Sequence, residues 1–187
     1  MDQRLWTLET RDRGERDARL AIERFFLHWE TLPRAAGALA PHIRTFLDRP
    51  NPAVQPRVAL VDVVPPERMY VRLFATDREN TLGRNLTGEN ALDVYPPEIR
   101  HLLWRGAEAV VGRPCGWLTE RIVTSAAGAS TRFLSISLPL LTDPDAAACL
   151  VNYTFPINRV EDKSDIALVN AVSPGRWIDL GAGVPHE

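Results

Sequence analysis

The sequence is poor in lysine and cysteine, and these shortages argue against several classes of protein. Lys163 is the only lysine among 22 basic residues, and no basic run occurs in a chain whose net charge is -2. A nucleic-acid-binding domain needs a concentrated positive patch, so that class is not favoured. Cys115 and Cys149 lie far apart without a CxxC spacing, which argues against a zinc site or a disulfide framework.

Long apolar runs are missing as well. No stretch approaches the ~20 uninterrupted apolar residues that span a bilayer, and the opening MDQRLWTLET lacks the apolar segment of a secretory signal. We therefore expect a cytoplasmic protein with no membrane partner. The chain has 187 residues, of which 45% are hydrophobic and 25% charged, so it should form one folded domain with an extension.

The first regular element is predicted at residues 15–32, and Pro33 ends it. Apolar residues recur there at the spacing of one helix face. Leu20 and Leu27 fall almost opposite that face, so a second partner is implied, and we predict that they mark a homodimer interface. Two stray exposed leucines are the alternative, since single exposed apolar residues are common. The apolar face consists of Ala18, Ile22, Phe25, Phe26, Trp29 and Leu32.

A proline-rich segment at 33–57 precedes the first predicted strands, and only PHIRTFL within it has a helical character. The apolar runs 58–64 and 69–75, separated by PPER, predict a hairpin. After Gly88 the residues ENALDV predict one or two helical turns. Pro96 and Pro97 then begin a longer helix, which Gly112 and Pro114 end. Its predicted buried face consists of Ile99, Leu102, Leu103, Ala107 and Val110.

Three further strands are predicted at 116–125, 131–141 and 147–157, joined by the short turns AAGAS and TDPDA. Such short turns are typical of antiparallel pairing. The middle strand alternates, with four apolar residues from Leu134 to Leu140 on one face and Ser135 and Ser137 on the other. The tail at 159–187 begins with charged residues but contains IALVNAV and WIDLGAGVP, so we expect part of it to pack back on the domain.

Three short segments bear a resemblance to a known family. LGRNLTG contains Gly83, Arg84, Leu86, Thr87 and Gly88 ahead of the helical connector. VVGRP, with Gly112, Arg113 and Pro114, closes the long helix, and LPL stands at 138–140. In this order and between these strands, the segments resemble the PAS domain, in particular stand-alone bacterial PAS proteins with an N-terminal helix. The resemblance covers about residues 32–157.

The resemblance implies an α+β fold: a five-stranded antiparallel sheet with helices on one face, preceded by the N-terminal amphipathic helix. It divides the chain into a helical extension at 1–32, a PAS-like domain at 33–158 and a tail at 159–187. It also implies a small-molecule pocket between the sheet and the helices. The expected role is therefore a sensor that binds ligands or proteins in signal transduction.

Aromatic walls with a few polar groups suit small-molecule sites, and on this ground we predict five ligand-binding residues. Each aromatic residue among them could equally be a plain core residue. The sequence leaves open the strand face on which Arg72 and Trp117 lie. The predicted residues are Tyr70, Arg72, Trp104, Trp117 and Tyr153.

The sequence does not identify a cofactor. Flavin-binding relatives place a reactive cysteine in the short helix after the glycine turn, where this chain has ENALDV, so no such adduct is expected. Cys115 lies beyond the long helix and is read as an apolar filler. Haem-binding relatives use a histidine of the long helix, but His101 falls about 200° from the predicted apolar face, so it should meet water.

No HExxH, GxSxG, paired carboxylates at helical spacing or nucleophile beside a histidine occurs, so we expect no enzyme. The alternative is a small cone-shaped α+β enzyme of the ketosteroid isomerase or dehydratase type. That alternative needs an acid or base inside an apolar cavity, and Asp62, Glu120 and His28 are its candidates. A third reading is an interaction module whose pocket is only filled core.

The sequence contains no kinase, cyclase or helix-turn-helix segment. We therefore expect the signal to pass from a homodimer to an unidentified protein partner. The DLGAGVP segment resembles a dinucleotide-binding loop only in its glycines, and we predict a turn there.

Overall fold

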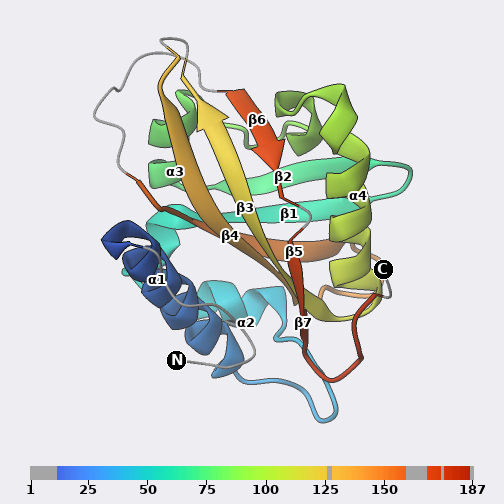
Figure 1. Ribbon diagram of the computed structural model, residues 1–187. Helices are drawn as coiled ribbons and strands as arrows, with labels where there is room; N and C mark the ends of the chain where they lie inside the picture. Colours follow the sequence, from blue (N-terminus) through green and yellow to red (C-terminus); the bar gives the residue numbers. More distant parts are fainter. Residues whose placement is uncertain (1–11, 126–127, 159–167, 174, 186–187) are drawn as a thin grey trace.

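The computed structural model describes residues 12–125, 128–158, 168–173 and 175–185. These residues form one curved antiparallel sheet with helices on both faces (Figure 1). The helices are α1 (Arg13–Glu30), α2 (Ile43–Asp48), η1 (Gln55–Arg57), α3 (Thr76–Leu82), η2 (Ala91–Val94) and α4 (Pro97–Gly112). The strands are β1 (Val58–Val64), β2 (Arg68–Phe74), β3 (Cys115–Thr124), β4 (Ser130–Leu140), β5 (Ala148–Pro156), β6 (Leu168–Val172) and β7 (Arg176–Asp179).

The sheet has the order β2-β1-β5-β4-β3-β6, and β7 also pairs with β3. Its first five strands therefore stand in the order 2-1-5-4-3, with the hairpin β1–β2 at one side and the meander β3–β4–β5 at the other. This is the arrangement expected of a PAS-like sheet. The five predicted strands are present, and among the described residues the tail adds two more, β6 and β7.

The tail strands β6 and β7 cover the outer edge of β3. β6 pairs with the second half of β3 and β7 with the first half, where Trp117 lies opposite Trp177. The two indole rings stack with centroids 5.5 Å apart. An uncovered edge strand would expose unpaired backbone groups, so the tail completes the sheet. Both strands of the tail are thus hydrogen-bonded to β3 in the same sheet.

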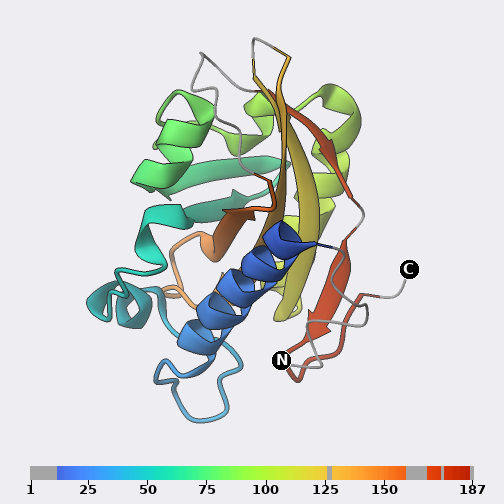
Figure 2. The same cartoon turned by 60° about the vertical axis from the view of Figure 1, so that its left-hand side comes forward.

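Helix α1 packs on one face of the sheet, across β4 and β5 (Figure 2). The Asp12 side chain caps it by accepting a hydrogen bond from the Glu15 backbone N–H at 2.8 Å. Phe25 is fully buried and stacks on Tyr153 of β5 with ring centroids 4.7 Å apart. The predicted apolar face of this helix is confirmed, and α2 packs on the same side of the sheet.

The opposite face of the sheet is covered by α3, η2 and α4. Residues 76–82 form α3, for which the sequence analysis predicted no helix. Gly83 and Gly88 of the LGRNLTG segment both have positive φ, +77° and +86°, and Gly83 ends α3 in the left-handed conformation. The glycines of the segment are therefore explained by two chain reversals that other residues rarely adopt.

The buried face of α4 differs from the prediction. Leu103, Ala107 and Val110 are buried as predicted, but Ile99 and Leu102 are only half-buried, and Trp104 and Gly106 are buried instead. The helix is rotated so that Gly106 meets the Trp117 ring of β3. On β4 the predicted alternation is present, yet Ser135 and Ser137 are also buried because the helices cover both faces of the sheet.

Candidate functional site

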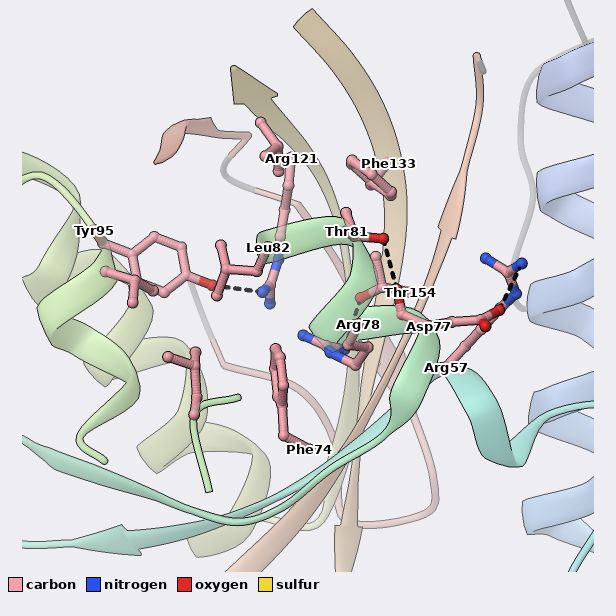
Figure 3. A pocket seen from close by; sticks show the side chains of 13 residues that line it. Arg57, Phe74, Asp77, Arg78, Thr81, Leu82, Tyr95, Arg121, Phe133 and Thr154 are labelled. Carbon is pink, nitrogen blue, oxygen red and sulfur yellow. Dashed lines mark hydrogen bonds and ion pairs between the residues drawn. The ribbon is translucent and has the colours of Figure 1, made fainter. Parts of the chain in front are cut away.

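A cavity lies between α3, η2 and the face of the sheet that α4 covers (Figure 3). It has two adjoining spaces of about 70 Å³ and about 50 Å³. On the same measure a buried water needs about 10–15 Å³, so the larger space has room for roughly five water molecules. Six residues line both spaces: Phe74, Arg78, Leu86, Val94, Tyr95 and Arg121.

The Arg78 side chain, from α3, reaches polar side chains of β5. Its Nη1 donates to Asn152 Oδ1 at 2.7 Å and to Thr154 Oγ1 at 3.0 Å. The same guanidinium lies over the Phe74 ring, with its Cζ atom 5.2 Å from the ring centroid. Its Nε and Nη2 atoms make no hydrogen bond to any described residue, so the fork keeps donors for a further acceptor.

The second arginine of the cavity, Arg121, comes from β3. Its Nη1 donates to the Tyr95 hydroxyl at 2.7 Å, and Tyr95 follows η2 directly in the chain. The Nε atom of Arg121 is buried and has no hydrogen-bond partner among the described residues. A buried unpaired donor costs about 1–3 kcal/mol, so this atom is a place where a ligand acceptor would be stabilising.

The charged side chains that line the cavity are mostly positive. Burial, and secondly the charge of Arg121, lower the pKa of Arg78 to about 10, so the group stays protonated at neutral pH. Asp77 is the one carboxylate among the residues lining the larger space, and it pairs with Arg57 at 2.9 Å. Within the described part of the chain, neither cavity arginine forms an ion pair with a carboxylate.

The polar groups beneath Arg78 form a connected strip on β4 and β5. Ser135 and Thr154 share a hydrogen bond of 2.8 Å, and the amide of Asn152 donates to Ser137 Oγ at 3.0 Å. Such buried groups need partners, and Arg78 completes the strip by donating to two of its members. The arginine is thereby held against the sheet in a half-buried position.

Of the five predicted ligand-binding residues, the structure places only Trp117 in the cavity wall, at the smaller space. Trp104 is buried under α4 in the same apolar cluster, but it does not line either space. The structure does not bring the other three to this site.

Tyr70, Arg72 and Tyr153 lie elsewhere, which corrects their predicted placement. The exposed Tyr70 and Arg72 stand on β2, and Arg72 pairs with Asp62 of β1 at 2.9 Å. A register shift between Leu60 and Val61 of the β1–β2 pair breaks the simple alternation of faces. Tyr153 lies on the opposite face of the sheet, against Phe25.

Arg78, Tyr95 and Arg121 were not predicted from the sequence. Arg121 could have been found, because it stands four residues after Trp117 and a strand repeats its face every two residues. Arg78 was hidden because α3 was not predicted, although Gly83 at its end and Asp77 and Glu79 in its first turn are typical helix signals.

The three acid or base candidates of the enzyme alternative do not line the cavity. Asp62 pairs with Arg72, and Glu120 accepts a hydrogen bond from Arg132 Nε at 2.6 Å. His28 lies on α1 against Phe46, and burial lowers the pKa of its ring. The unpaired buried carboxylate that this alternative requires is therefore not found at Asp62.

The two cysteines and His101 lie outside the cavity. Burial raises the pKa of the Cys115 thiol to about 11 and that of Cys149 to about 12, so neither is an activated nucleophile. His101 is exposed, as predicted, and its Nδ1 lies 3.0 Å from Glu67. The described residues contain no group of three His, Cys, Asp or Glu side chains placed to hold a metal ion. None of their helices is long and apolar enough to cross a membrane.

Comparison with known proteins gives likenesses of structure. No family model matches the chain, and no curated protein matches it. A LOV protein of Rhodobacter sphaeroides is similar in structure with a TM-score of 0.41 and 19% identity, over 56% of this chain and 61% of that one. A PAS domain from Colwellia psychrerythraea gives 0.40 and 12%, over 53% and 85%. The PAS domain of Bordetella pertussis BvgS gives 0.41 and 11%, over 56% and 79%.

This chain thus spans about three-fifths of the Rhodobacter protein. The chain has a PAS-type fold: the sheet order 2-1-5-4-3, with the α3–η2–α4 connector between β2 and β3 folded over one face. The predicted fold is confirmed at this level.

Proposed function

We propose that the protein is a PAS-type sensory module that binds a small molecule in the cavity between the α3–η2–α4 connector and the sheet. The observation that carries this proposal is the pair Arg78 and Arg121, whose side chains turn inward although both keep unused donors. If this region served only as packed core, it would not be expected to hold two arginine side chains with unused donors, because burying each without a partner costs free energy.

The cavity is small compared with the roughly 300–1,000 Å³ typical of sites for drug-sized ligands. A ligand of a few non-hydrogen atoms therefore fits the described conformation. Larger ligands require α3 or η2 to move outward. Both elements are short and lie between β2 and α4, so such a movement would leave the sheet intact.

The proposed route of the signal runs through β5 to α1. Asn152 accepts a hydrogen bond from Arg78 on the cavity face, and the next residue, Tyr153, stacks on Phe25 of α1 on the other face. A ligand that repositions Arg78 would therefore act on a strand that α1 contacts directly. We propose that the homodimer interface lies on the outer side of α1, where Leu20 and Leu27 are 39% and 58% exposed. A protein partner would then bind differently when the position of α1 changes.

The binding function is tested with a cavity-filling variant. Val94 lines both spaces of the cavity, so Val94→Phe should fill them, whereas Leu141→Phe adds the same side chain at an exposed position. A panel of neutral, anionic and cationic compounds of up to about ten non-hydrogen atoms is screened by saturation-transfer NMR. Circular dichroism establishes that both variants are folded.

Binding by at least one charge class is expected in the wild type and in Leu141→Phe, and it should be lost in Val94→Phe. The proposal fails if no compound of any class binds the wild type. It also fails if Val94→Phe binds as the wild type does.

A further inference from the structure

The cavity combines a cationic end with an apolar wall. Arg78 and Arg121 supply two guanidinium groups, and the Tyr95 hydroxyl accepts from Arg121 while keeping its own hydrogen to donate. Around them lie side chains without polar atoms, including Leu82, Leu86, Val94 and Phe133. Figure 3 shows Arg78, Arg121 and Tyr95 converging from α3, β3 and the segment after η2.

Among the described residues, Arg78 and Arg121 have no carboxylate partner, and this decides the charge of the ligand. Arg57 also lines the larger space, but it is paired with Asp77. The positive charge of this arginine is therefore neutralised within the chain, unlike the charges of Arg78 and Arg121. Neither Arg78 nor Arg121 pairs with a carboxylate of the described residues, and the charge of Arg121 contributes to lowering the pKa of Arg78. An anion between the two would relieve this repulsion and satisfy the buried Nε of Arg121.

The shape of the donors decides the type of anion. A guanidinium presents a planar fork of parallel N–H groups, which matches the two oxygens of a carboxylate. The apolar wall would leave a fully polar anion, such as phosphate, with oxygens that face no donor. A carboxylate with a short apolar tail satisfies both ends of the cavity.

We propose that the ligand of this cavity is a small aliphatic monocarboxylate, held by Arg78, Arg121 and Tyr95 with its tail toward Leu86 and Val94. The proposal rests on the proposed binding function and adds the chemical class of the ligand. The volume of about 70 Å³ limits the ligand to roughly the size of butyrate in the described conformation.

The test uses butyrate, its neutral isostere butyramide, its cationic analogue butylammonium and inorganic phosphate, at constant ionic strength. Affinities are measured by saturation-transfer NMR and by the shift of the thermal unfolding midpoint. Butyrate should bind saturably and raise the midpoint. Butyramide, butylammonium and phosphate should bind at least about tenfold more weakly, because hydrogen bonds to a charged partner are the stronger ones.

Three variants locate the binding. Arg78→Gln and Arg121→Gln should each weaken butyrate binding about 10-fold to 100-fold, as expected for the loss of a hydrogen-bonded charge. Arg105→Gln removes an exposed arginine of α4 outside the cavity and should leave the affinity unchanged. Thermal unfolding without ligand shows whether each variant folds.

The outcomes separate the two proposals. If butyramide or butylammonium binds in a Val94→Phe-sensitive manner and butyrate does not, the carboxylate assignment is wrong and the binding function stands. Equal binding of phosphate and butyrate identifies an inorganic anion site and likewise overturns the assignment. If none of the probes or panel compounds binds the folded wild type, both proposals fail. Equal loss in Arg105→Gln would overturn the location.

Discussion

Replacing Gly106 by alanine should destabilise the protein, although alanine is the better helix former. Gly106 lies in the middle of α4 and faces Trp117 of β3. A Cβ atom at this position would lie 2.2 Å from Cζ3 and 2.4 Å from Cη2 of the indole ring. Both distances are far below van der Waals contact, so the helix or the ring must move.

The ring has little room to move. Its other side stacks on Trp177 of β7, with centroids 5.5 Å apart, so a displaced Trp117 would disturb the pairing of β7 with β3. Overpacking of this kind costs about 1–3 kcal/mol. The helix propensity of alanine returns at most about 1 kcal/mol. Subtracting this gain from the overpacking cost leaves an expected net loss of up to about 2 kcal/mol in the free energy of unfolding.

Urea unfolding followed by circular dichroism measures this loss, and Gly112→Ala is the matched control. Gly112 is the last residue of the same helix, and a Cβ atom there would meet no atom within 4 Å. That variant should be neutral or more stable by up to about 1 kcal/mol. If Gly106→Ala is as stable as Gly112→Ala, the close approach of α4 to β3 is refuted.

Two further predictions concern α1. Phe25→Ala should cost about 3–5 kcal/mol in unfolding free energy because the side chain is fully buried against Tyr153, whereas Leu47→Ala, at an exposed position of α2, should change it by at most about 0.5 kcal/mol. Urea unfolding of the two variants checks this, and equal effects would contradict the packing of α1 on the sheet. The double variant Leu20→Glu, Leu27→Glu should halve the molecular mass in light scattering. A monomeric wild type, or an unchanged mass, would remove the proposed interface.

The sequence predicted those elements whose hydrophobic pattern has a single interpretation. The repeat of α1 is clear because it must bury one face, and the Pro-Pro break between two β-branched runs defined the first hairpin. Residues 76–82 lacked such a pattern because α3 buries only Leu82. Its helical character depends on capping and on the contacts of Arg78, which a hydrophobic repeat does not show.

The location of the candidate site was predicted more successfully than the residues that line it. The connector was expected to enclose a pocket, and a cavity lies there. The face of a strand, however, is ambiguous when apolar residues run continuously, as they do around Tyr153 in β5, and a register shift adds a second uncertainty at Arg72 in β2. The aromatic residues of the sequence favoured a prediction of aromatic cavity walls. The position of the two arginines, Arg78 and Arg121, depends on tertiary contacts that the sequence does not show.

The two faces of the sheet meet different demands, and this difference supports a binding role for one of them. The face under α1 is almost wholly apolar, as maximal burial requires. The cavity face instead carries Ser135, Ser137, Asn152 and Thr154 on adjacent strands, where apolar side chains would contribute more to stability. Every one of these polar groups must be matched, and Arg78 serves that purpose only by placing an unneutralised charge inside the fold. Local choices that lower stability in this way are typical of functional sites, and under the proposed function a bound anion would make them favourable.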